Sequence, residues 1–269
     1  GRAARPMSSG LPPFSQSAPY YELLYGDKDY ALEAAFVFKT LRARRARIKS
    51  ILELGCGPGH HAAELAGRGC SVLGVDGSSG MLARAKRRAA RLEFGVQKRL
   101  SFLRGDIRRL RVARTFDAVI SLFHVFSYLP EPEDLAAALA TARVHLRPGG
   151  VLLFDCWYGP AVLSQGCGSR RQVVENGDCR LVSSARPRRD RRRNAVEVLY
   201  RYAVRRKSRG AARRFQESHR MRYWFRREVE DAERAAGLVP LEAFEWGTRR
   251  PLGARTWNAC FLARRPRRA

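Results

Sequence analysis

The hydrophobic pattern divides the chain into two parts with different periodicity. In the first part, short apolar runs that suit strands alternate with longer stretches whose apolar residues recur at helical spacing. The runs predict strands at Ile48–Leu54, Ser71–Val75, Leu100–Leu103, Phe116–Ser121 and Val151–Cys156. The stretches between them predict helices at His61–Gly67, Gly80–Glu93 and Glu133–Leu146. Alternation of this kind is typical of a doubly wound, mostly parallel α/β sheet.

The second part alternates apolar with polar residues, as half-buried strands do. It predicts strands at Arg180–Ala185, Asn194–Val204 and Gln216–Phe225, joined by basic connections. We therefore expect a small antiparallel β insertion over residues 165–225. The pattern then predicts a helix at Arg226–Ala236 with Gly237 as its C-cap, and two strands at Val239–Trp246 and Arg255–Arg264.

The N-terminal region is less regular. Residues 1–20 are rich in serine, proline and glycine, and we expect them to be loose. Tyr21–Arg47 has helical spacing, and Asp29 is placed to cap a second helix within it. We expect one domain over residues 21–264 that includes the β insertion.

Charge is the unusual feature of the composition. The 269 residues include 52 basic and 25 acidic side chains, for a formal net charge of +27, and only six of the bases are lysines. A positive field of this size favours anionic partners such as nucleic acids, nucleotides or acidic membranes. An arginine-rich coding bias spread over a solvated surface explains the same composition, so charge alone leaves the partner open.

Several other classes are disfavoured. No apolar run approaches the roughly 20 residues that a membrane-spanning helix needs, and residues 1–10 lack the apolar core of a secretory signal. The six cysteines form no C-x-x-C pair and do not cluster with the five histidines as metal ligands do. We expect reduced thiols, no bound metal, no membrane contact and a cytoplasmic location.

The strongest local signal is the glycine-rich loop Glu53-Leu54-Gly55-Cys56-Gly57-Pro58-Gly59, which follows a predicted strand and precedes a predicted helix. Glycines let the backbone turn tightly there and approach a ligand without a Cβ clash. A nicotinamide or flavin site expects G-x-G-x-x-G, whose third glycine would fall at His60. The E-x-G-x-G-x-G spacing instead resembles motif I of the class I S-adenosylmethionine (SAM) methyltransferases.

Further features follow the loop in the order in which these methyltransferases carry theirs. Asp76 ends the second predicted strand, where an acid accepts from both ribose hydroxyls. Asp106 follows the third strand, where it is able to receive the adenine amine while Ile107 covers the ring. Residues 116–121 match the fourth strand, and residues 146–150 match the turn before the fifth. The resemblance implies a SAM-dependent methyltransferase.

A narrower resemblance covers most of the chain. Tyr21-Glu22-Leu23-Leu24-Tyr25, residues 28–34, 122–129, 155–158, 194–198, 215–237 and 253–255 resemble the N,N-dimethyltransferases that act on nucleotide-linked aminosugars (desosamine and mycaminose types). Their fold is a seven-stranded Rossmann-like sheet whose last two strands form a reversed hairpin, with a small β-layer over the active site. The strands that the alternating pattern predicts over residues 180–225 agree with that layer.

The resemblance implies roles for individual residues. It assigns to SAM Tyr30, Glu33, Glu53, Gly55, Cys56, Gly57, Gly59, Asp76, Gly77, Met81, Asp106, Ile107, Ser121 and Leu122. It places Tyr25 where cofactor and acceptor meet, and Trp157, Tyr158 and Arg255 toward the sugar nucleotide. Trp157 and Tyr158 follow the carboxyl end of a strand, where such sheets bind ligands, and an arginine is able to hold a phosphate with two hydrogen bonds. Plain helix packing, core packing and a solvated arginine are the alternatives.

His124 follows the fourth predicted strand, near the expected position of the transferred methyl group. Its ring is able to accept a proton from an amine or a hydroxyl. The aminosugar enzymes carry small polar residues at this point, so this departure leaves the identity of the acceptor open. A buried, hydrogen-bonded histidine without catalytic duty is the alternative.

Methyl transfer needs little acid–base help because the sulfonium is an activated donor, so we expect catalysis mainly by in-line placement in a dry pocket. The predicted activity is methyl transfer to a small molecule, first of all to an amino group of a nucleotide-activated sugar. O- or C-methylation of another natural-product scaffold is the second interpretation. A homodimer is compatible with both.

Two rival functions fit less well. Exocyclic-amine methylases of nucleic acids carry (D/N)-P-P-(Y/F) where this chain has Ser121-Leu122-Phe123-His124, and no cysteine adjoins a proline as in cytosine-C5 enzymes. No RNA-binding module is recognisable in the sequence. A non-catalytic SAM-binding protein is opposed by the intact glycines, Asp76 and Asp106.

Overall fold

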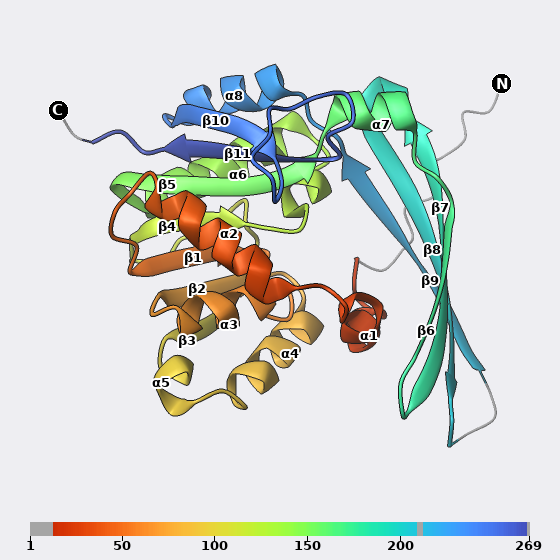
Figure 1. Ribbon diagram of the computed structural model, residues 1–269. Helices are drawn as coiled ribbons and strands as arrows, with labels where there is room; N and C mark the ends of the chain where they lie inside the picture. The colour runs from red at the N-terminus through yellow and green to blue at the C-terminus, as the bar shows by residue number, and fades with distance from the viewer. Residues whose placement is uncertain (1–12, 209–211, 268–269) are drawn as a thin grey trace.

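Seven strands form one sheet at the centre of the computed structural model, which describes residues 13–208 and 212–267 (Figure 1). They are β1 (Ser50–Leu54), β2 (Ser71–Asp76), β3 (Leu100–Arg104), β4 (Phe116–Ser121), β5 (Leu146–Trp157), β10 (Val239–Glu245) and β11 (Asn258–Arg264). Their order across the sheet is β10-β11-β5-β4-β1-β2-β3. Strands β1 to β5 are parallel, and β11 is antiparallel to both β5 and β10. The predicted doubly wound fold with a reversed last hairpin is confirmed.

Both faces of this sheet are covered, which explains why β1 and β4 read as continuous apolar runs. Helices α2 (Tyr30–Arg42) and α3 (His60–Gly67) pack on one face, and α6 (Pro132–His145) and α8 (Arg226–Ala235) pack on the other. Helix α4 (Ser79–Ala89) lies beside α3 and β3.

The predicted helix Gly80–Glu93 ends four residues early, at Ala89. Glu93 has an extended backbone, with ψ of 143°, and a short helix α5 (Phe94–Gln97) starts after it. The strand β5 in turn begins at Leu146, so the glycines of the predicted turn at 147–150 lie within its irregular first part.

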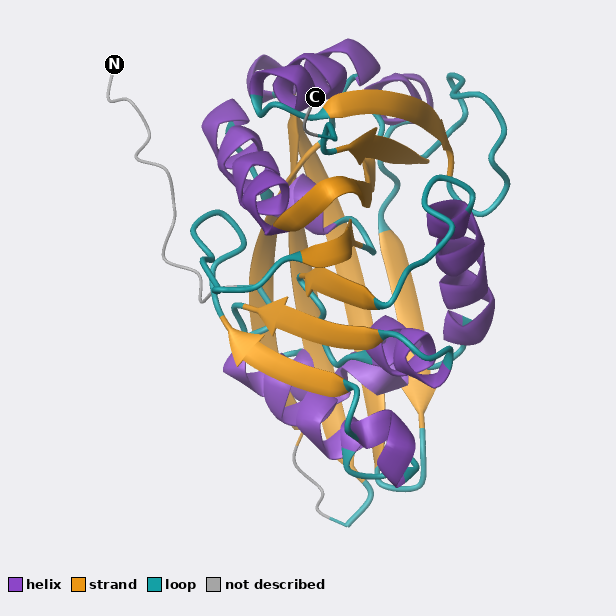
Figure 2. Cartoon of the chain, turned by 90° about the vertical axis from the view of Figure 1, so that its left-hand side faces the viewer, coloured by secondary structure: helices purple, strands orange, loops and turns teal. Residues whose placement is uncertain are grey.

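A second sheet of four antiparallel strands stands across the carboxyl ends of β1 to β5, and we call it the cover sheet (Figures 1 and 2). Its strands are β6 (Arg170–Glu175), β7 (Cys179–Asp190), β8 (Ala195–Arg206) and β9 (Ala212–Arg222). The sequence predicted three of them. Strand β6 was missed because it is an edge strand whose first residues, Arg170-Arg171-Gln172, are polar. The seven-residue helix α7 (Gly159–Gln165) was missed because it is short and begins with Gly-Pro.

Trp224 joins the cover sheet to the main sheet. Its side chain is fully buried, and its indole Nε1 donates to the carbonyl of Phe126 at 3.0 Å. Its backbone amide donates to the carbonyl of Trp157 at 2.9 Å, and Gly159 returns a bond of the same length to the Trp224 carbonyl. The chain therefore enters and leaves the cover sheet at one hydrogen-bonded junction.

Residues 13–17, which we call the strap, lie against the cover sheet. The backbone amides of Gln16 and Ser17 donate to Glu217 Oε1 at 2.7 and 3.0 Å, and Ser17 Oγ donates to Oε2 at 2.6 Å. This part of the segment that we expected to be loose is therefore fixed by a buried carboxylate, Glu217. Residues 1–12 lie outside the described residues.

The helical stretch predicted from Tyr21 divides in two. After the 3-10 turn η1 (Ala18–Tyr20), helix α1 (Tyr21–Tyr25) has Gly26 as its C-cap, and α2 begins four residues after that glycine. Asp29 Oδ1 accepts from the backbone amide of Leu32 at 2.8 Å, which confirms the predicted cap. Helix α1 lies between the two sheets (Figure 1), so this break lets it turn toward the cover sheet.

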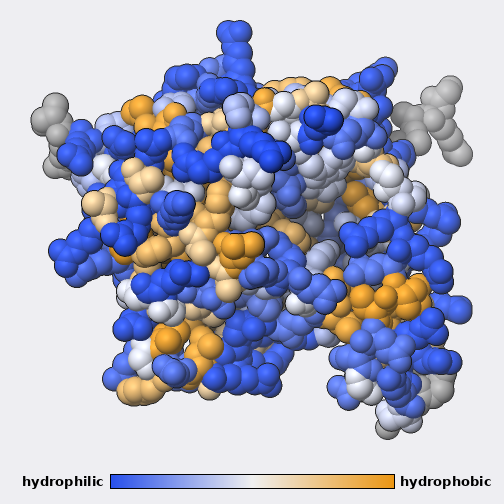
Figure 3. Space-filling view, viewed as in Figure 1, coloured by the Kyte–Doolittle hydropathy of each residue, from blue (hydrophilic) through white to orange (hydrophobic). Residues whose placement is uncertain are grey.

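Hydrophilic residues cover most of the face seen in Figure 3, as the arginine content requires. Apolar residues gather where α1 meets the cover sheet, among them Leu23, Leu24 and Val174. In the described part of the chain, no helix has both the length and the apolar character to cross a membrane. All six cysteines are unbridged, and five of them are buried.

Glu233 on α8 makes the stability of the fold depend on pH between about 4.5 and 8. Its side chain is buried, and its Oε1 has no hydrogen-bond partner among the described residues. Burial raises the pKa of this carboxyl from 4.5 to about 8. The folded chain therefore favours the protonated form of Glu233. The contribution of this group to the free energy of unfolding is fully present below pH 4.5 and is lost as the pH rises through 8. The slope between those values is up to about 1.4 kcal/mol per pH unit.

We expect Glu233→Gln to raise the Tm above pH 8 and to leave it unchanged near pH 4.5. Thermal unfolding at both pH values measures the difference. Glu93→Gln is the matched control, because Glu93 is exposed. Equal Tm shifts in the two variants would contradict the burial argument. Glu53, whose pKa burial also raises to about 8, keeps part of the slope in either variant.

Candidate active site

A cavity of about 1220 Å³ lies between the carboxyl ends of the main sheet and the cover sheet. Its wall is built from the loops after β1, β2, β3 and β4, from α1, from the strap and from β8 and β9. Strands β1 and β4 are neighbours whose chains leave toward opposite faces, and open α/β sheets bind ligands at such a point.

The glycine loop forms one side of the cavity. Gly55 and Gly57 line it with positive φ angles of 77° and 53°, which favour glycine. The amides of Gly55 and Cys56 both donate to the carbonyl of Val75, at 2.7 and 2.9 Å, and so fix the loop onto β2. A Cβ at Gly57 would meet nothing within 4 Å, so its Cα faces open space.

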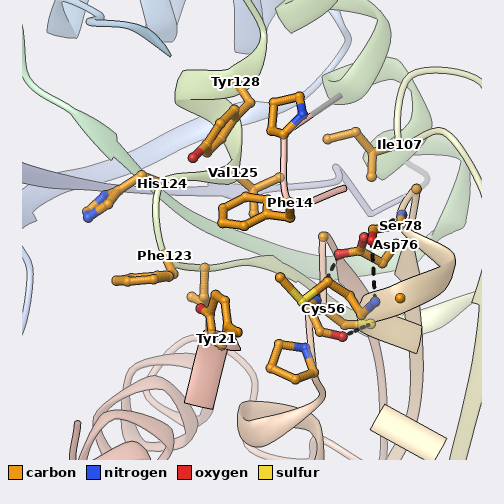
Figure 4. Close-up of a pocket in the computed structure, with 18 of the residues that line it drawn as sticks. Phe14, Tyr21, Cys56, Asp76, Ser78, Ile107, Phe123, His124, Val125 and Tyr128 are labelled. Atoms are coloured by element: carbon orange, nitrogen blue, oxygen red, sulfur yellow. Dashed lines mark hydrogen bonds between the residues drawn. The ribbon is translucent and has the colours of Figure 1, made fainter. Parts of the chain in front are cut away.

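Asp76 holds the loop from the neighbouring strand. Its Oδ2 accepts from the amide of Gly57 and its Oδ1 from the amide of Ser78, both at 2.8 Å (Figure 4). Each carboxylate oxygen keeps acceptor capacity for another donor. Burial raises the pKa of Asp76, because few of its contacts are with water. The arrangement suits a pair of ligand hydroxyls.

Glu53 lies at the floor of the cavity. Its side chain is 1% exposed, and its Oε2 has no hydrogen-bond partner among the described residues. Burial raises its pKa to about 8. Its Oε1 lies 3.8 Å from His61 Nδ1, so among the described residues the free oxygen is Oε2. A buried carboxylate oxygen without a hydrogen bond suits a cationic group, which would hold the carboxylate in its charged form. SAM carries two such groups, an ammonium and a sulfonium.

Glu33 does not line the cavity, but it contacts His61, which does. Its Oε2 lies 2.8 Å from His61 Nε2, and its Oε1 lies 3.1 Å from Lys28 Nζ. Although burial opposes the shift, the hydrogen bond to His61 and the Lys28 charge lower the pKa of Glu33. Tyr30 also lines the cavity; its ring stacks on His60 at 4.0 Å, and burial raises its pKa to about 12.

The loop after β3 closes the same half of the cavity. Ile107 lines it, and Gly77, Met81 and Leu122 add further wall. Asp106 also lines it, but its carboxylate is gripped by Arg108, with Nη2 2.7 Å from Oδ2. That hydrogen bond lowers the pKa of Asp106. Cys56 faces this half too, and burial raises the pKa of its thiol well above the usual range, so it is inert.

The opposite half of the cavity is aromatic. Tyr25 and Phe123 pack edge to face at 5.4 Å, and Trp157 lies at the end of β5. In Figure 4, Phe123 and His124 lie across the cavity from Asp76 and Cys56, with the ring of Phe14 between the two groups. A ligand with a planar or apolar face suits this half.

His124 is held by a buried carboxylate on the next strand. Its Nδ1 lies 2.7 Å from Asp155 Oδ2, although the ring makes no aligned hydrogen bond among the described residues. Its backbone amide donates to both oxygens of Asp155 at 3.2 Å. His124 has a positive φ of 62°, a strained value for a non-glycine residue, and the contacts with Asp155 maintain it.

The structure keeps four predicted residues, besides Glu33, out of the cavity wall. Gly59 caps α3 with φ of 76°, and a Cβ there would lie 3.0 Å from that of Ala85, so its role is close packing. Ser121 is buried and donates to the carbonyl of Leu54. Tyr158 packs in the main core because successive strand residues face opposite sides, and Trp157 takes the cavity side. Arg255 is exposed on the loop before β11.

The cavity also contains residues that the sequence did not identify, chiefly Phe14, Tyr128, Tyr200 and Arg220. Tyr128 lies in the segment 122–129, which resembles the aminosugar enzymes, and Tyr200 and Tyr202 share one face of β8. The sequence therefore contained information that could have identified both Tyr128 and Tyr200. No sequence pattern could have identified Phe14, because contacts between the strap and β9 place its ring at the cavity.

Residues 51–150 match the protein family described as Methyltransferase domain. A curated relative, dTDP-3-amino-3,4,6-trideoxy-alpha-D-glucopyranose N,N-dimethyltransferase from Streptomyces venezuelae, is 31% identical over 225 residues, 82% of this chain and 89% of the relative. The crystal structure of Streptomyces venezuelae DesVI matches with a TM-score of 0.77 at 28% identity, covering 91% of this chain and 97% of that one. SAM-bound CalS10, an amino pentose methyltransferase from Micromonospora echinaspora, matches with a TM-score of 0.72 at 28% identity over 91% and 96% of the chains.

Proposed function

The chain belongs to the class I SAM-dependent methyltransferases that are related to the aminosugar N,N-dimethyltransferases, and we propose that its acceptor is an amino group on a nucleotide-activated sugar. SAM is its methyl donor. The observation that carries the proposal is the likeness over 82% of the chain to a relative named for a dTDP-aminosugar.

The residues of the first half of the cavity fit SAM. Asp76 would accept from the ribose hydroxyls, Ile107 would cover the adenine, and Glu53 would face the cationic end. Gly57 leaves the space that a cofactor against the loop requires. When bound, SAM supplies a methyl group already activated by its sulfonium.

The chain's own work is then placement and exclusion of water. The aromatic half of the cavity, with Tyr25, Phe123 and Trp157, would hold the sugar so that its amine faces the methyl group. The strap and the cover sheet close the other side, and a dry, closed site strengthens each polar contact inside it. Of the arginines that line the cavity, Arg220 lies on strand β9 of the cover sheet, and we propose that it contacts a phosphate of the nucleotide sugar.

We expect His124→Ala to keep turnover with an amine acceptor, with kcat lowered by no more than about tenfold, because placement rather than proton removal dominates. Steady-state kinetics with saturating SAM measure this. Loss of turnover with SAM and acceptor binding intact would instead establish His124 as an obligatory base.

A hydroxyl acceptor is the second candidate, and the close contact of His124 with Asp155 favours it. A hydroxyl needs a base before it attacks, and a histidine beside a carboxylate is the common arrangement for one. The same His124→Ala variant would then lose about 100-fold or more in kcat.

The test is a panel of acceptors at saturating SAM. It contains a nucleoside-diphosphate aminosugar, the free aminosugar, the deaminated nucleotide sugar with a hydroxyl in place of the amine, and an RNA oligonucleotide. Mass spectrometry of the products counts the methyl groups. Methylation of the nucleotide-linked amine alone supports the proposal; transfer to the hydroxyl analogue supports O-methylation, and transfer to RNA contradicts both. We also propose that the enzyme is cytoplasmic and forms a homodimer. Sedimentation of the purified chain tests the dimer, and fractionation of the producing cells tests the location.

A further inference from the structure

Three polar side chains form a chain of contacts that begins at the cavity wall and runs into the cover sheet, and none of them is among the residues that we assign to SAM. Tyr128, from the short helix η2 (Val125–Tyr128) after β4, lines the cavity, and its hydroxyl lies 2.9 Å from His219 Nδ1. His219 Nε2 lies 3.3 Å from Glu217 Oε2 on the same face of β9. His219 and Glu217 are only 2% and 1% exposed.

The direction of the hydrogen bonds follows from Glu217. Three donors from the strap surround its carboxylate, and a fourth is His219. Despite burial, these hydrogen bonds lower its pKa to about 2, so Glu217 is ionised and only accepts. His219 Nε2 therefore carries a hydrogen, and in the neutral ring Nδ1 is left as an acceptor.

Tyr128 must then donate its hydroxyl hydrogen to His219. Burial raises the pKa of Tyr128 well above the usual range, so the group stays a phenol and does not ionise on its own. With its hydrogen directed at His219, its oxygen keeps lone pairs for a donor in the cavity. In Figure 4, the oxygen of Tyr128 points from the upper wall toward the gap between His124 and Phe14.

We propose that Tyr128 is a catalytic residue whose oxygen accepts a hydrogen bond from the acceptor amine, and that His219 and Glu217 are positioning residues that fix its direction. This inference rests on the proposed amine acceptor. It gives β9 of the cover sheet a part in the reaction besides closing the cavity.

The array also offers the amine a route for one proton. As the amine nitrogen forms its bond to the methyl carbon and the carbon–sulfur bond breaks, the electron pair of that bond goes to sulfur. The nitrogen then carries the positive charge and gives a proton to Tyr128 oxygen, while the Tyr128 proton passes to His219 Nδ1. His219 becomes an imidazolium, whose charge the ionised Glu217 offsets.

The surroundings keep water from this route. The ring of Phe14 lies over the array, with its centroid 4.9 Å from that of His219 and 5.8 Å from that of Tyr128. The ring centroid of Tyr200 lies 4.7 Å from that of His219. His124 differs, because its Nδ1 makes no aligned hydrogen bond among the described residues and its ring is 16% exposed.

The test uses the whole chain and compares four variants. Tyr128→Phe removes only the hydroxyl that orients the amine, and we expect kcat to fall about 100-fold through misplacement while the Kd for SAM stays unchanged. His219→Asn places an amide oxygen where Nδ1 lies, so it keeps an acceptor for Tyr128 and should lose no more than about tenfold. His219→Gln places its amide near Nε2 instead and should fall as far as Tyr128→Phe. Tyr223→Phe, a buried tyrosine outside the cavity, is the control and should keep wild-type kcat.

Equal losses in His219→Asn and His219→Gln would show a merely structural role and overturn the proposal, as would a kcat of Tyr128→Phe within threefold of wild type. If no variant and no wild-type sample methylates an amine, the proposed function fails instead. A second readout needs no acceptor: the ¹⁵N imidazole shifts of His219 should report hydrogen on Nε2 and none on Nδ1. The opposite tautomer would overturn the inference whatever the activity.

Discussion

Asp76→Ala is expected to weaken SAM binding by at least about 100-fold, because a hydrogen bond to a charged group contributes about 1.5–3 kcal/mol and the carboxylate has two ribose hydroxyls to accept from. The variant also removes the acceptor for the Gly57 and Ser78 amides, so the glycine loop loses its support from β2. Isothermal titration with SAM measures the change. We also expect the enthalpy of SAM binding to be less favourable than in the wild type, since polar contacts contribute most of it.

Two further variants separate the causes. Asp76→Asn keeps one carbonyl oxygen but turns the other position into a donor, so we expect an intermediate loss in affinity. Asp231→Ala removes a carboxylate that is 61% exposed on α8, and it should leave the Kd unchanged. A wild-type Kd for Asp76→Ala would contradict the assignment of this crevice to the adenosyl group.

Gly57→Ala is expected to abolish measurable SAM binding while costing only about 1–2 kcal/mol of stability. The cost arises because φ at this position is 53°, which L residues adopt with strain. No heavy atom lies within 4 Å of the added Cβ, so the fold itself accommodates it. That open space is the part of the cavity in which the cofactor would lie against the loop.

Gly55→Ala provides the contrast. Its φ is also positive, but the added Cβ would lie 2.5 Å from both Cγ atoms of Val125. We expect this variant to lose stability first, through displacement of Val125 and the segment that follows β4. Thermal unfolding and SAM titration of both variants distinguish the two effects. Equal losses of Tm would show that Gly57 is needed for folding and not for the ligand.

The fold was predictable where its determinants are local. The glycine loop, Asp29 as a cap and the alternation of strands with helices each depend on neighbours within a few residues, and the structure places all three as expected. Strand β6 was not predictable, because an edge strand needs no apolar alternation when its partner strand supplies the register. The early end of the helix at Ala89 left no clear signal either.

The two halves of the site differ in how far the sequence determines them. The cofactor half comes from residues that directly follow β1, β2 and β3, so a motif is enough to find them. The part of the wall formed by Phe14 and Tyr128 depends on contacts between distant segments: Ser17 meets Glu217 across 200 residues, and Tyr128 meets His219 across 91. Charge patterning did not help, since Arg255 is one exposed arginine among many.

The junction at Trp224 has a consequence for attempts to alter which substrates the enzyme accepts. Trp224, which follows β9, shares backbone hydrogen bonds with Trp157 at the end of β5 and with Gly159, and its indole fills the core beside Phe126. Exchanging the whole cover sheet with that of a relative would therefore open the interior of the host. Substitutions confined to the inner faces of β8 and β9 leave this seam intact. Substrate selectivity should therefore be changed by substituting side chains on β8 and β9 and not by replacing the whole cover sheet.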